Sequence, residues 1–433
     1  MHAALLPNGH VVFLDKLENY TEARLQNGRY AYSTVYNPLN LELKPQAIPS
    51  NAFCCGGAFL VDGTLMTMGG NGPLTWLDDS IADGFDALRY LYDNEESGDW
   101  VEYMYPFLHM LKDGTLFVFT STASQIFDID HNTVLQEMPR LPGMYRTYPN
   151  TGGSVMLPLT KQNNYEAEVM ICGGGEADSM TSLTDDSCGR LKPMSPNPQW
   201  QMTNMPGGGR TMVEGILLLD GTVLWMNGAR VGCQGFGTAS VPALDALIYD
   251  PRTDSWSTAG SSEIARMYHS VALMLLDGTI LVAGSNPNEM PVLEEDVVPD
   301  DPLKAFPTEF RVERYTPSYL LGDKVETRPA YIDINNKVFV PGQTISRVRF
   351  EAPAGKPKKV KVLLYHGGFV THGLHMGQVM VEMEHLDLKH VRGPQYEMNV
   401  KVPEIKLAPG PYVVYVVIDS VPGVGQFVSV RTA

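Results

Sequence analysis

The segment Arg266-Met267-Tyr268-His269-Ser270 leads into an apolar run over residues 271–276 and then into the dipeptide Asp277-Gly278. Because Asp-Gly accepts the positive φ values of a tight two-residue turn, this stretch predicts the first strand and the turn of a β-hairpin. Tyr268 and His269 stand side by side where that strand begins. Adjacent side chains of a regular strand point to opposite faces, so both groups can serve one site only where the backbone departs from regular geometry.

A phenol next to an imidazole is a ligand pair suited to copper or iron. The simpler interpretation places a surface histidine beside a core tyrosine, and for an isolated pair this arrangement is the commoner one. Tyr268 and His269 are therefore candidate metal ligands only if the surrounding sequence supports a site.

The hairpin pattern recurs through the first three-quarters of the chain. Each copy has an apolar strand, an Asn-Gly or Asp-Gly turn and a second strand, with turn glycines at Gly9, Gly63, Gly114, Gly221 and Gly278. The spacings are 54 (9 to 63), 51 (63 to 114), 107 (114 to 221) and 57 (221 to 278) residues. The interval of 107 holds two periods, because strands at 154–159 and 167–172 flank a longer loop at 160–166. Units of about 50 residues with four strands are typical of a kelch-type β-propeller.

Six such hairpins precede a change of pattern. Glu313-Arg314-Tyr315-Thr316-Pro317 closes the repeats, and from about Arg328 the chain shows the alternating strands of another all-β module. We therefore predict an all-β protein with two domains. A kelch-type propeller occupies residues 1–325, and an immunoglobulin-like β-sandwich occupies residues 326–433.

Charge and composition limit the possible partners and compartments. Asp and Glu number 49 against 32 Lys and Arg, which gives a formal net charge of −17. This balance argues against nucleic acid or an anionic membrane as a partner, and the chain has no run of about 18 apolar residues that could span a membrane. The sequon Asn19-Tyr20-Thr21 favours secretion. We expect a secreted monomer, although residues 1–6 run directly into the turn Pro7-Asn8-Gly9 and show no signal peptide.

The five cysteines are an odd number, so at least one is unpaired if the others form disulfides. Cys172 and Cys188 flank a loop rich in Gly, Asp and Ser and are the expected disulfide. Closing so short a loop stabilises the fold by about 3 kcal/mol. The alternative is a pair of buried thiols, which is also what we expect of Cys55 and Cys233.

Four segments, taken together, resemble the copper radical oxidases, most closely the glyoxal oxidase branch and more distantly galactose oxidase. They occur in the order found in that family, and the resemblance covers nearly the whole chain. The segments are Phe53-Cys54-Cys55-Gly56-Gly57, Arg266-Met267-Tyr268-His269-Ser270, Glu313-Arg314-Tyr315-Thr316-Pro317-Ser318-Tyr319-Leu320, and Thr371-His372 with Met376-Gly377-Gln378. The resemblance implies a seven-bladed propeller followed by an early-set sandwich.

The resemblance also implies the site residues. Tyr268, His269 and His372 would bind copper, and Tyr268 would take the proton of the substrate. Cys54, rather than Cys55, would be joined to a tyrosine in a thioether that stores a radical, because a one-electron metal needs a second one-electron store for a two-electron oxidation.

The implied substrates are small aldehydes, oxidised as hydrates, or hydroxy-carbonyls such as glyoxal. Dioxygen would leave as hydrogen peroxide. Oxidation of primary or aryl alcohols is a second interpretation, because it would use the same metal ligands. A non-catalytic propeller that binds a partner through its loops is a third, since a propeller fold does not by itself imply chemistry.

The sequence departs from the family at the radical tyrosine. In the family it lies in an Arg-Trp-Tyr type motif that opens the blade after the cysteine. Here the tyrosine in a comparable place is Tyr105, which no Arg or Trp precedes in register. We interpret this as the loss of one blade, between about Leu91 and Val101, together with the radical tyrosine. The alternative is that Tyr105 fills the place. A further departure is His375, which replaces an amide and is expected to contact solvent or the core.

Overall fold

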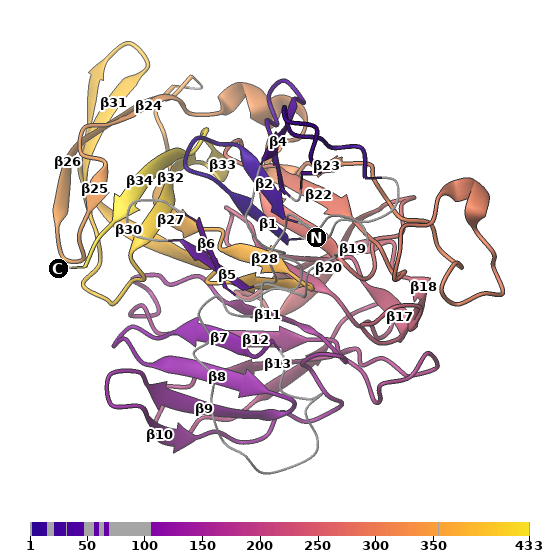
Figure 1. Cartoon of the computed structure of the whole chain (residues 1–433). Coiled ribbons are helices and arrows are strands. Elements are labelled where there is room, and N and C mark those ends of the chain that lie inside the picture. Colours follow the sequence, from indigo (N-terminus) through magenta and orange to yellow (C-terminus); the bar gives the residue numbers. More distant parts are fainter. Residues whose placement is uncertain are drawn as a thin grey trace.

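The computed structural model describes residues 2–14, 21–31, 33–46, 56–59, 65–68, 105–353 and 355–432. The regular elements in these ranges are β-strands and the short 3₁₀ helices η2 (Glu294–Asp296), η3 (Ser318–Leu320) and η4 (Gly322–Thr327). The predicted all-β class is confirmed (Figure 1). No helix in the described part of the chain is long and apolar enough to cross a membrane.

All six predicted hairpins form antiparallel strand pairs. The inner strand of each pair comes first: β1 (His2–Leu5), β5 (Gly56–Phe59), β7 (Phe107–Met110), β11 (Gly153–Met156), β15 (Glu214–Leu217) and β21 (Ser270–Met274). Their partners are β2 (Val11–Leu14), β6 (Leu65–Met68), β8 (Leu116–Thr120), β12 (Val169–Cys172), β16 (Val223–Met226) and β22 (Ile280–Gly284).

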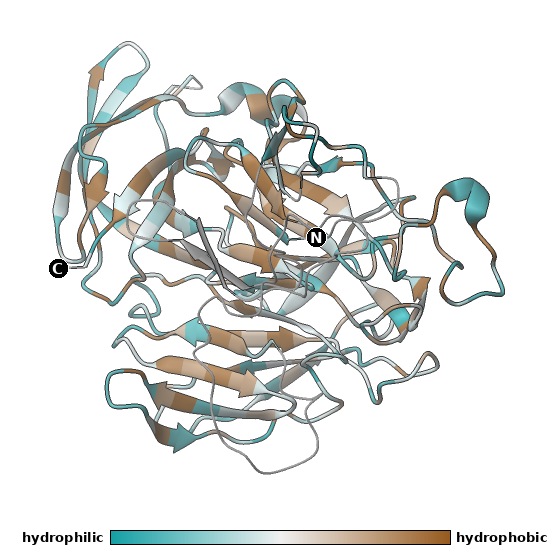
Figure 2. Ribbon diagram, viewed as in Figure 1, coloured by the Kyte–Doolittle hydropathy of each residue, from teal (hydrophilic) through white to brown (hydrophobic). Residues whose placement is uncertain are grey.

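Further strands extend these pairs outward into propeller blades. They are β3 (Ser33–Tyr36), β4 (Leu43–Gln46), β9 (Ala123–Asp128), β10 (Thr133–Glu137), β13 (Ser187–Leu191), β14 (Gln201–Asn204), β19 (Asp245–Asp250), β20 (Ser255–Ser261) and β23 (Glu313–Tyr315). A separate hairpin of β17 (Ala229–Gly232) and β18 (Ala239–Pro242) lies between β16 and β19 in the sequence. Burial decreases from the inner to the outer strands of the blades. The inner strands β11, β15 and β21 are wholly buried, whereas the outer strand β10 is exposed throughout. Figure 2 shows the same trend, with hydrophobic strands around the centre of the molecule and hydrophilic residues in the outer loops.

A hairpin from the C-terminal part of the chain completes the first blade. Its strands are β28 (Phe369–Thr371) and β29 (Leu374–Met376), and the sheet has the order β29-β28-β1-β2-β3-β4. This hairpin contacts the inner strands of the other blades, with β28 against β5 and β21 and β29 against β7, β11 and β15. It therefore lies on the axis of the propeller, in the middle of the molecule in Figure 1.

The remaining C-terminal strands form the sandwich. They are β24 (Ala330–Ile334), β25 (Val338–Phe339), β26 (Thr344–Glu351), β27 (Val360–His366), β30 (Val379–Arg392), β31 (Gln395–Lys401), β32 (Gly410–Ile418), β33 (Val421–Pro422) and β34 (Gln426–Val430). The long strand β30 joins the two layers, because residues 379–383 pair with β27 and residues 384–392 pair with β31.

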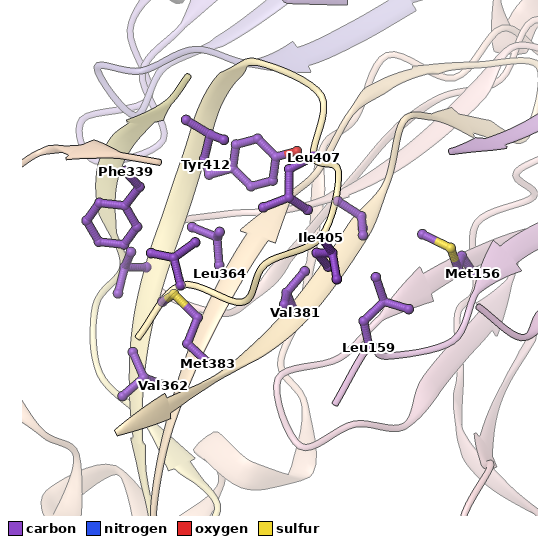
Figure 3. Packing of buried hydrophobic residues seen from close by; sticks show 14 of the residues in the cluster. Met156, Leu159, Phe339, Val362, Leu364, Val381, Met383, Ile405, Leu407 and Tyr412 are labelled. Carbon is purple, nitrogen blue, oxygen red and sulfur yellow. The ribbon is translucent and has the colours of Figure 1, made fainter. Parts of the chain in front are cut away.

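Residues of the sandwich and of the propeller pack together in two hydrophobic clusters of the described part of the chain. Figure 3 shows Phe339, Leu364 and Val381 of the sandwich in the same cluster as Met156 and Leu159 of the propeller. Backbone hydrogen bonds reinforce the contact, since Leu159 donates to the carbonyl of Met380 at 2.9 Å and accepts from the amide of Glu382 at 2.8 Å. The hairpin β28–β29 lies between β27 and β30 in the sequence. The packing of the sandwich against the blades therefore fixes the position of this hairpin at the axis.

The structure pairs Cys172 with Cys188 in a disulfide between the neighbouring strands β12 and β13, as predicted. Cys233 is a buried thiol, which was also expected. Its Sγ lies 3.3 Å from the Asp178 carboxylate.

Candidate metal centre at the propeller axis

Three inner strands are preceded by a residue with the same backbone conformation. Each stands nine positions before the turn glycine of its hairpin and has a positive φ: Tyr105 (54°) before Gly114, Met212 (57°) before Gly221 and His269 (66°) before Gly278. The inner strand begins one or two residues later in every case. Because the blades repeat around one axis, these equivalent positions face that axis from different sides.

Cys54 occupies the same position, nine residues before Gly63. Cys54 and Cys55 lie outside the described residues, and so does the segment between Leu91 and Val101 where we expected the loss of a blade. The strand that follows Cys54, β5, begins at Gly56.

Tyr268 and His269 meet because the backbone between them is irregular. The positive φ of His269 breaks the alternation of side chains immediately before β21. As a result the phenol and imidazole rings stack, with centroids 3.8 Å apart and planes 26° apart. Both residues are buried. We expected that Tyr268 and His269 could share a site only where the backbone is irregular. The positive φ of His269 confirms this irregularity.

His372 reaches the same place from the turn between β28 and β29. It also has a positive φ, of 54°, and is almost completely buried. Its ring centroid lies 5.3 Å from that of His269 and 5.6 Å from that of Tyr268. Of the four predicted site residues, the structure thus brings together Tyr268, His269 and His372.

Hydrogen bonds orient the two imidazoles. Nδ1 of His269 donates to the carbonyl oxygen of Asn286 at 3.0 Å, which leaves the lone pair on Nε2. Nδ1 of His372 shares a 2.7 Å hydrogen bond with the hydroxyl of Thr371. Burial lowers the pKa of His372 to about 3 and holds the pKa of His269 well below its ordinary value. Both rings are therefore neutral near pH 7, the form that binds metals.

Arg266 anchors the segment that carries Tyr268 and His269. Its buried guanidinium donates to the carbonyl of Gly284 at 2.7 Å and to the carboxylate of Glu313 at 2.9 and 3.0 Å. Two of the segments that carry the family resemblance therefore meet in an ion pair. Because contacts behind a metal ligand hold it in place, this ion pair would fix the segment that presents Tyr268 and His269.

Several site residues were missed by sequence reasoning. Tyr148 and Phe236 lie in loops, with ring centroids 6.2 Å from His372 and 5.9 Å from Tyr268 respectively. His2 is fully buried, and its ring lies 6.0 Å from that of His372. The repeat could have pointed to His2, which begins the first inner strand, but its contact with His372 depends on a pairing between the two ends of the chain.

His375 contacts the core, one of the two outcomes that we expected. Its side chain is buried, and Nε2 lies 3.5 Å from a carboxylate oxygen of Glu214. Glu214 is itself fully buried and accepts a hydrogen bond from the amide of Ala272 at 2.6 Å. This pair ties the axial hairpin to β15 and β21.

The donor atoms that the described residues bring to the axis are imidazole nitrogens and a phenol oxygen. Within the described ranges, no three His, Cys, Asp or Glu side chains lie close enough together to hold a metal ion. A metal at the axis would be bound by the neutral imidazoles of His269 and His372 together with the oxygen of Tyr268. Imidazole nitrogen and phenol oxygen together suit copper.

Comparison with known proteins agrees with this geometry. Residues 77–319, more than half of the chain, match the family model of the glyoxal oxidase N-terminus. The chain belongs to the glyoxal oxidase family. Residues 328–430 match the galactose oxidase-like early set domain. The resemblance to copper radical oxidases is confirmed, and so is an all-β fold of propeller-like blades followed by an early set β-sandwich.

Two relatives within the family are plant proteins. Aldehyde oxidase GLOX of Vitis pseudoreticulata is 30% identical over 98% of this chain and 89% of that protein. Aldehyde oxidase GLOX1 of Arabidopsis thaliana is 30% identical over 89% of this chain and 65% of that protein. Among solved structures, a fungal alcohol oxidase of the AA5 family, in complex with copper, superposes with a TM-score of 0.67 at 17% identity and covers 99% of this chain and 96% of that one. It shows that the fold is shared.

The comparison with the Vitis glyoxal oxidase relative extends over 488 positions, whereas this chain has 433 residues. At least 488 − 433 = 55 positions of the comparison therefore have no counterpart here.

Proposed function

We propose that this chain is a copper-dependent oxidase that converts small aldehydes, taken as hydrates, or hydroxy-carbonyls to acids, with dioxygen reduced to hydrogen peroxide. The observation that carries the proposal is the meeting of Tyr268, His269 and His372 at the propeller axis, with ring centroids 3.8 to 5.6 Å apart. The aldehyde oxidase names of the plant relatives support the choice of substrate.

The residues of the site have different roles in the proposed reaction. Copper, when bound, would supply one-electron chemistry and make a neighbouring hydroxyl group easier to deprotonate. His269 would hold it through Nε2, because its Nδ1 donates to Asn286, and His372 would do the same with the Nδ1 proton donated to the Thr371 hydroxyl. The oxygen of Tyr268 takes the proton from the substrate hydroxyl. Burial of all three residues keeps bulk water away from the reacting carbon.

The proposed oxidase needs a radical store, and we propose Tyr105 as the residue that supplies it. If one repeat has been lost, the blade that Tyr105 opens directly follows the blade that Cys54 opens. Tyr105 also holds the repeat position of His269 and contacts His372. We therefore assign the thioether partner of Cys54 to Tyr105.

A second candidate function is a propeller that binds copper but does not oxidise substrates. The lack of an Arg or Trp in register before Tyr105 favours it, because the family's radical tyrosine lies in an Arg-Trp-Tyr type motif that opens the blade after the cysteine.

Peptide-mapping mass spectrometry separates the two candidates. In copper-loaded, air-oxidised protein, the oxidase proposal requires a peptide in which Cys54 is joined to Tyr105 with the loss of two hydrogens. The same sample should release peroxide from glyoxal or methylglyoxal. Free Cys54 in folded, copper-loaded protein, together with no peroxide, would leave the binding propeller as the function.

We further propose that the protein acts outside the cell, as a monomer whose partners are a small-molecule substrate and dioxygen. The disulfide between Cys172 and Cys188 supports this compartment, because such bonds persist in oxidising environments. Occupancy of the sequon at Asn19, measured by a mass shift after glycosidase treatment of protein from the native source, would test it.

A further inference from the structure

His2 is an imidazole at the site that the proposed metal ligands do not include. It is the first residue of β1 and is completely buried. The register of β1 and β28 places it opposite Thr371, the neighbour of His372. Its ring stacks on Phe369, with centroids 5.7 Å apart and planes 25° apart, and lies 6.0 Å from the ring of His372.

The hydrogen bonding of His2 leaves one polar atom unused. Nδ1 lies 3.2 Å from the carbonyl oxygen of Leu14, and because a carbonyl can only accept, Nδ1 carries the proton. Nε2 therefore holds a lone pair. It is buried, and no residue in the described part of the chain donates a hydrogen bond to it. A buried acceptor without a donor is unfavourable, so a ligand with a hydroxyl group would gain by filling this role.

We propose that Nε2 of His2 accepts a hydrogen bond from the second hydroxyl group of an aldehyde hydrate bound at the axis. This inference rests on the proposed oxidase function and identifies the substrate class of the same site. An aldehyde hydrate carries two hydroxyl groups on one carbon. One of them gives its proton to Tyr268, and the other remains to be bound. A primary alcohol has no second hydroxyl group on that carbon.

His2 is therefore a specificity residue. It favours hydrates over alcohols, because only the hydrate can satisfy both Tyr268 and His2. A site that pairs a buried acceptor with a substrate hydroxyl discriminates against the analogue that lacks it, since the acceptor is then left without a partner.

A matched pair of ligands tests this role without turnover. Methylglyoxal hydrate and hydroxyacetone differ by the one hydroxyl group in question. The copper-loaded protein is first treated with a mild one-electron reductant that removes the radical but leaves Cu(II), so that no ligand can be oxidised. Each ligand is then titrated in anaerobically, and binding is followed by the change in the electron paramagnetic resonance spectrum of Cu(II). The wild-type protein should bind the hydrate about ten times more tightly than hydroxyacetone, the difference expected for one such hydrogen bond. Equal affinity of the wild-type protein for both ligands overturns the proposal without any variant.

Two substitutions then assign the preference to His2. His2→Phe keeps a flat ring against Phe369 but has no acceptor, so it should lose the preference for the hydrate and bind hydroxyacetone unchanged. His2→Gln restores an acceptor at the end of the side chain and should recover most of the preference. If His2→Phe lowers the affinity for both ligands equally, or lowers neither affinity, His2 is not the residue that selects the hydrate. If neither ligand alters the spectrum of the wild-type copper protein, the proposed function itself fails.

Discussion

The ring of Tyr105 stacks on the imidazole of His372, with centroids 4.5 Å apart and planes 23° apart. Tyr105 stands two residues before the third inner strand, β7, whereas His372 lies in the turn of the β28–β29 hairpin, from the C-terminal part of the chain. Its ring also lies 5.7 Å from that of Tyr148. The blade opened by Tyr105 thus contributes a phenol to the site, although the Arg and Trp of the family motif do not precede it.

Tyr105→Phe should retain the stacking on His372 but abolish the thioether and peroxide release, because phenylalanine has no oxygen to carry the radical. Copper content should stay at the wild-type level. Peptide mapping and a peroxidase-coupled assay measure the two effects. Tyr148→Phe is the matched control, since it removes a neighbouring phenol of the site. Peroxide release by Tyr105→Phe at the wild-type rate would exclude Tyr105 as the radical store.

His269→Ala and His372→Ala should each weaken copper binding by tenfold or more, because each removes one of the two nitrogen donors. The control is His109→Ala, which removes a buried imidazole that shares a 2.7 Å hydrogen bond with Ser154. Copper affinity is measured by competition with a chelator of known affinity. If both His269→Ala and His372→Ala bind copper as tightly as the wild-type protein, the metal site lies elsewhere.

His109 should make stability depend on pH. Burial lowers its pKa from 6.5 to about 4, so between these values the unfolded chain binds more protons than the folded protein. Stability from this residue is present above pH 6.5 and is lost as the pH falls towards 4, by about 3 kcal/mol in total. Urea unfolding at pH 4.5 and pH 7 should show a smaller pH effect in His109→Gln than in the wild-type protein. An identical pH effect in both proteins would contradict this assignment.

Glu214 should be important for folding, because it is fully buried and its carboxylate accepts from the amide of Ala272 at 2.6 Å and from Asn227 at 3.3 Å. Glu214→Ala leaves these donors without a partner and should lower the free energy of unfolding by about 2–4 kcal/mol. Glu137→Ala, on the exposed strand β10, should change it by less than about 0.5 kcal/mol. Thermal unfolding compares the two variants, and equal losses would refute the role of burial.

Local sequence patterns were sufficient to predict much of the fold. Each turn, such as Asp277-Gly278, was predictable because its conformation depends on the residues within it. The irregular backbone at His269 could be inferred because two neighbouring side chains had to face one site. The family motifs then pointed to Tyr268, His269 and His372. Periodicity alone could not supply His372, because it lies 103 residues after His269 and in another domain.

Short stretches of sequence were thus enough to predict the order of the repeats, the change to a sandwich and the kinds of side chain at the axis. The contact of His2 with His372 was not, because it depends on β1 pairing with β28, strands more than 360 residues apart. The placing of Tyr105 on His372 likewise follows from how the blades close around the axial hairpin. Such contacts arise only when the whole ring and the sandwich pack together, since ring closure joins residues that share no local signal.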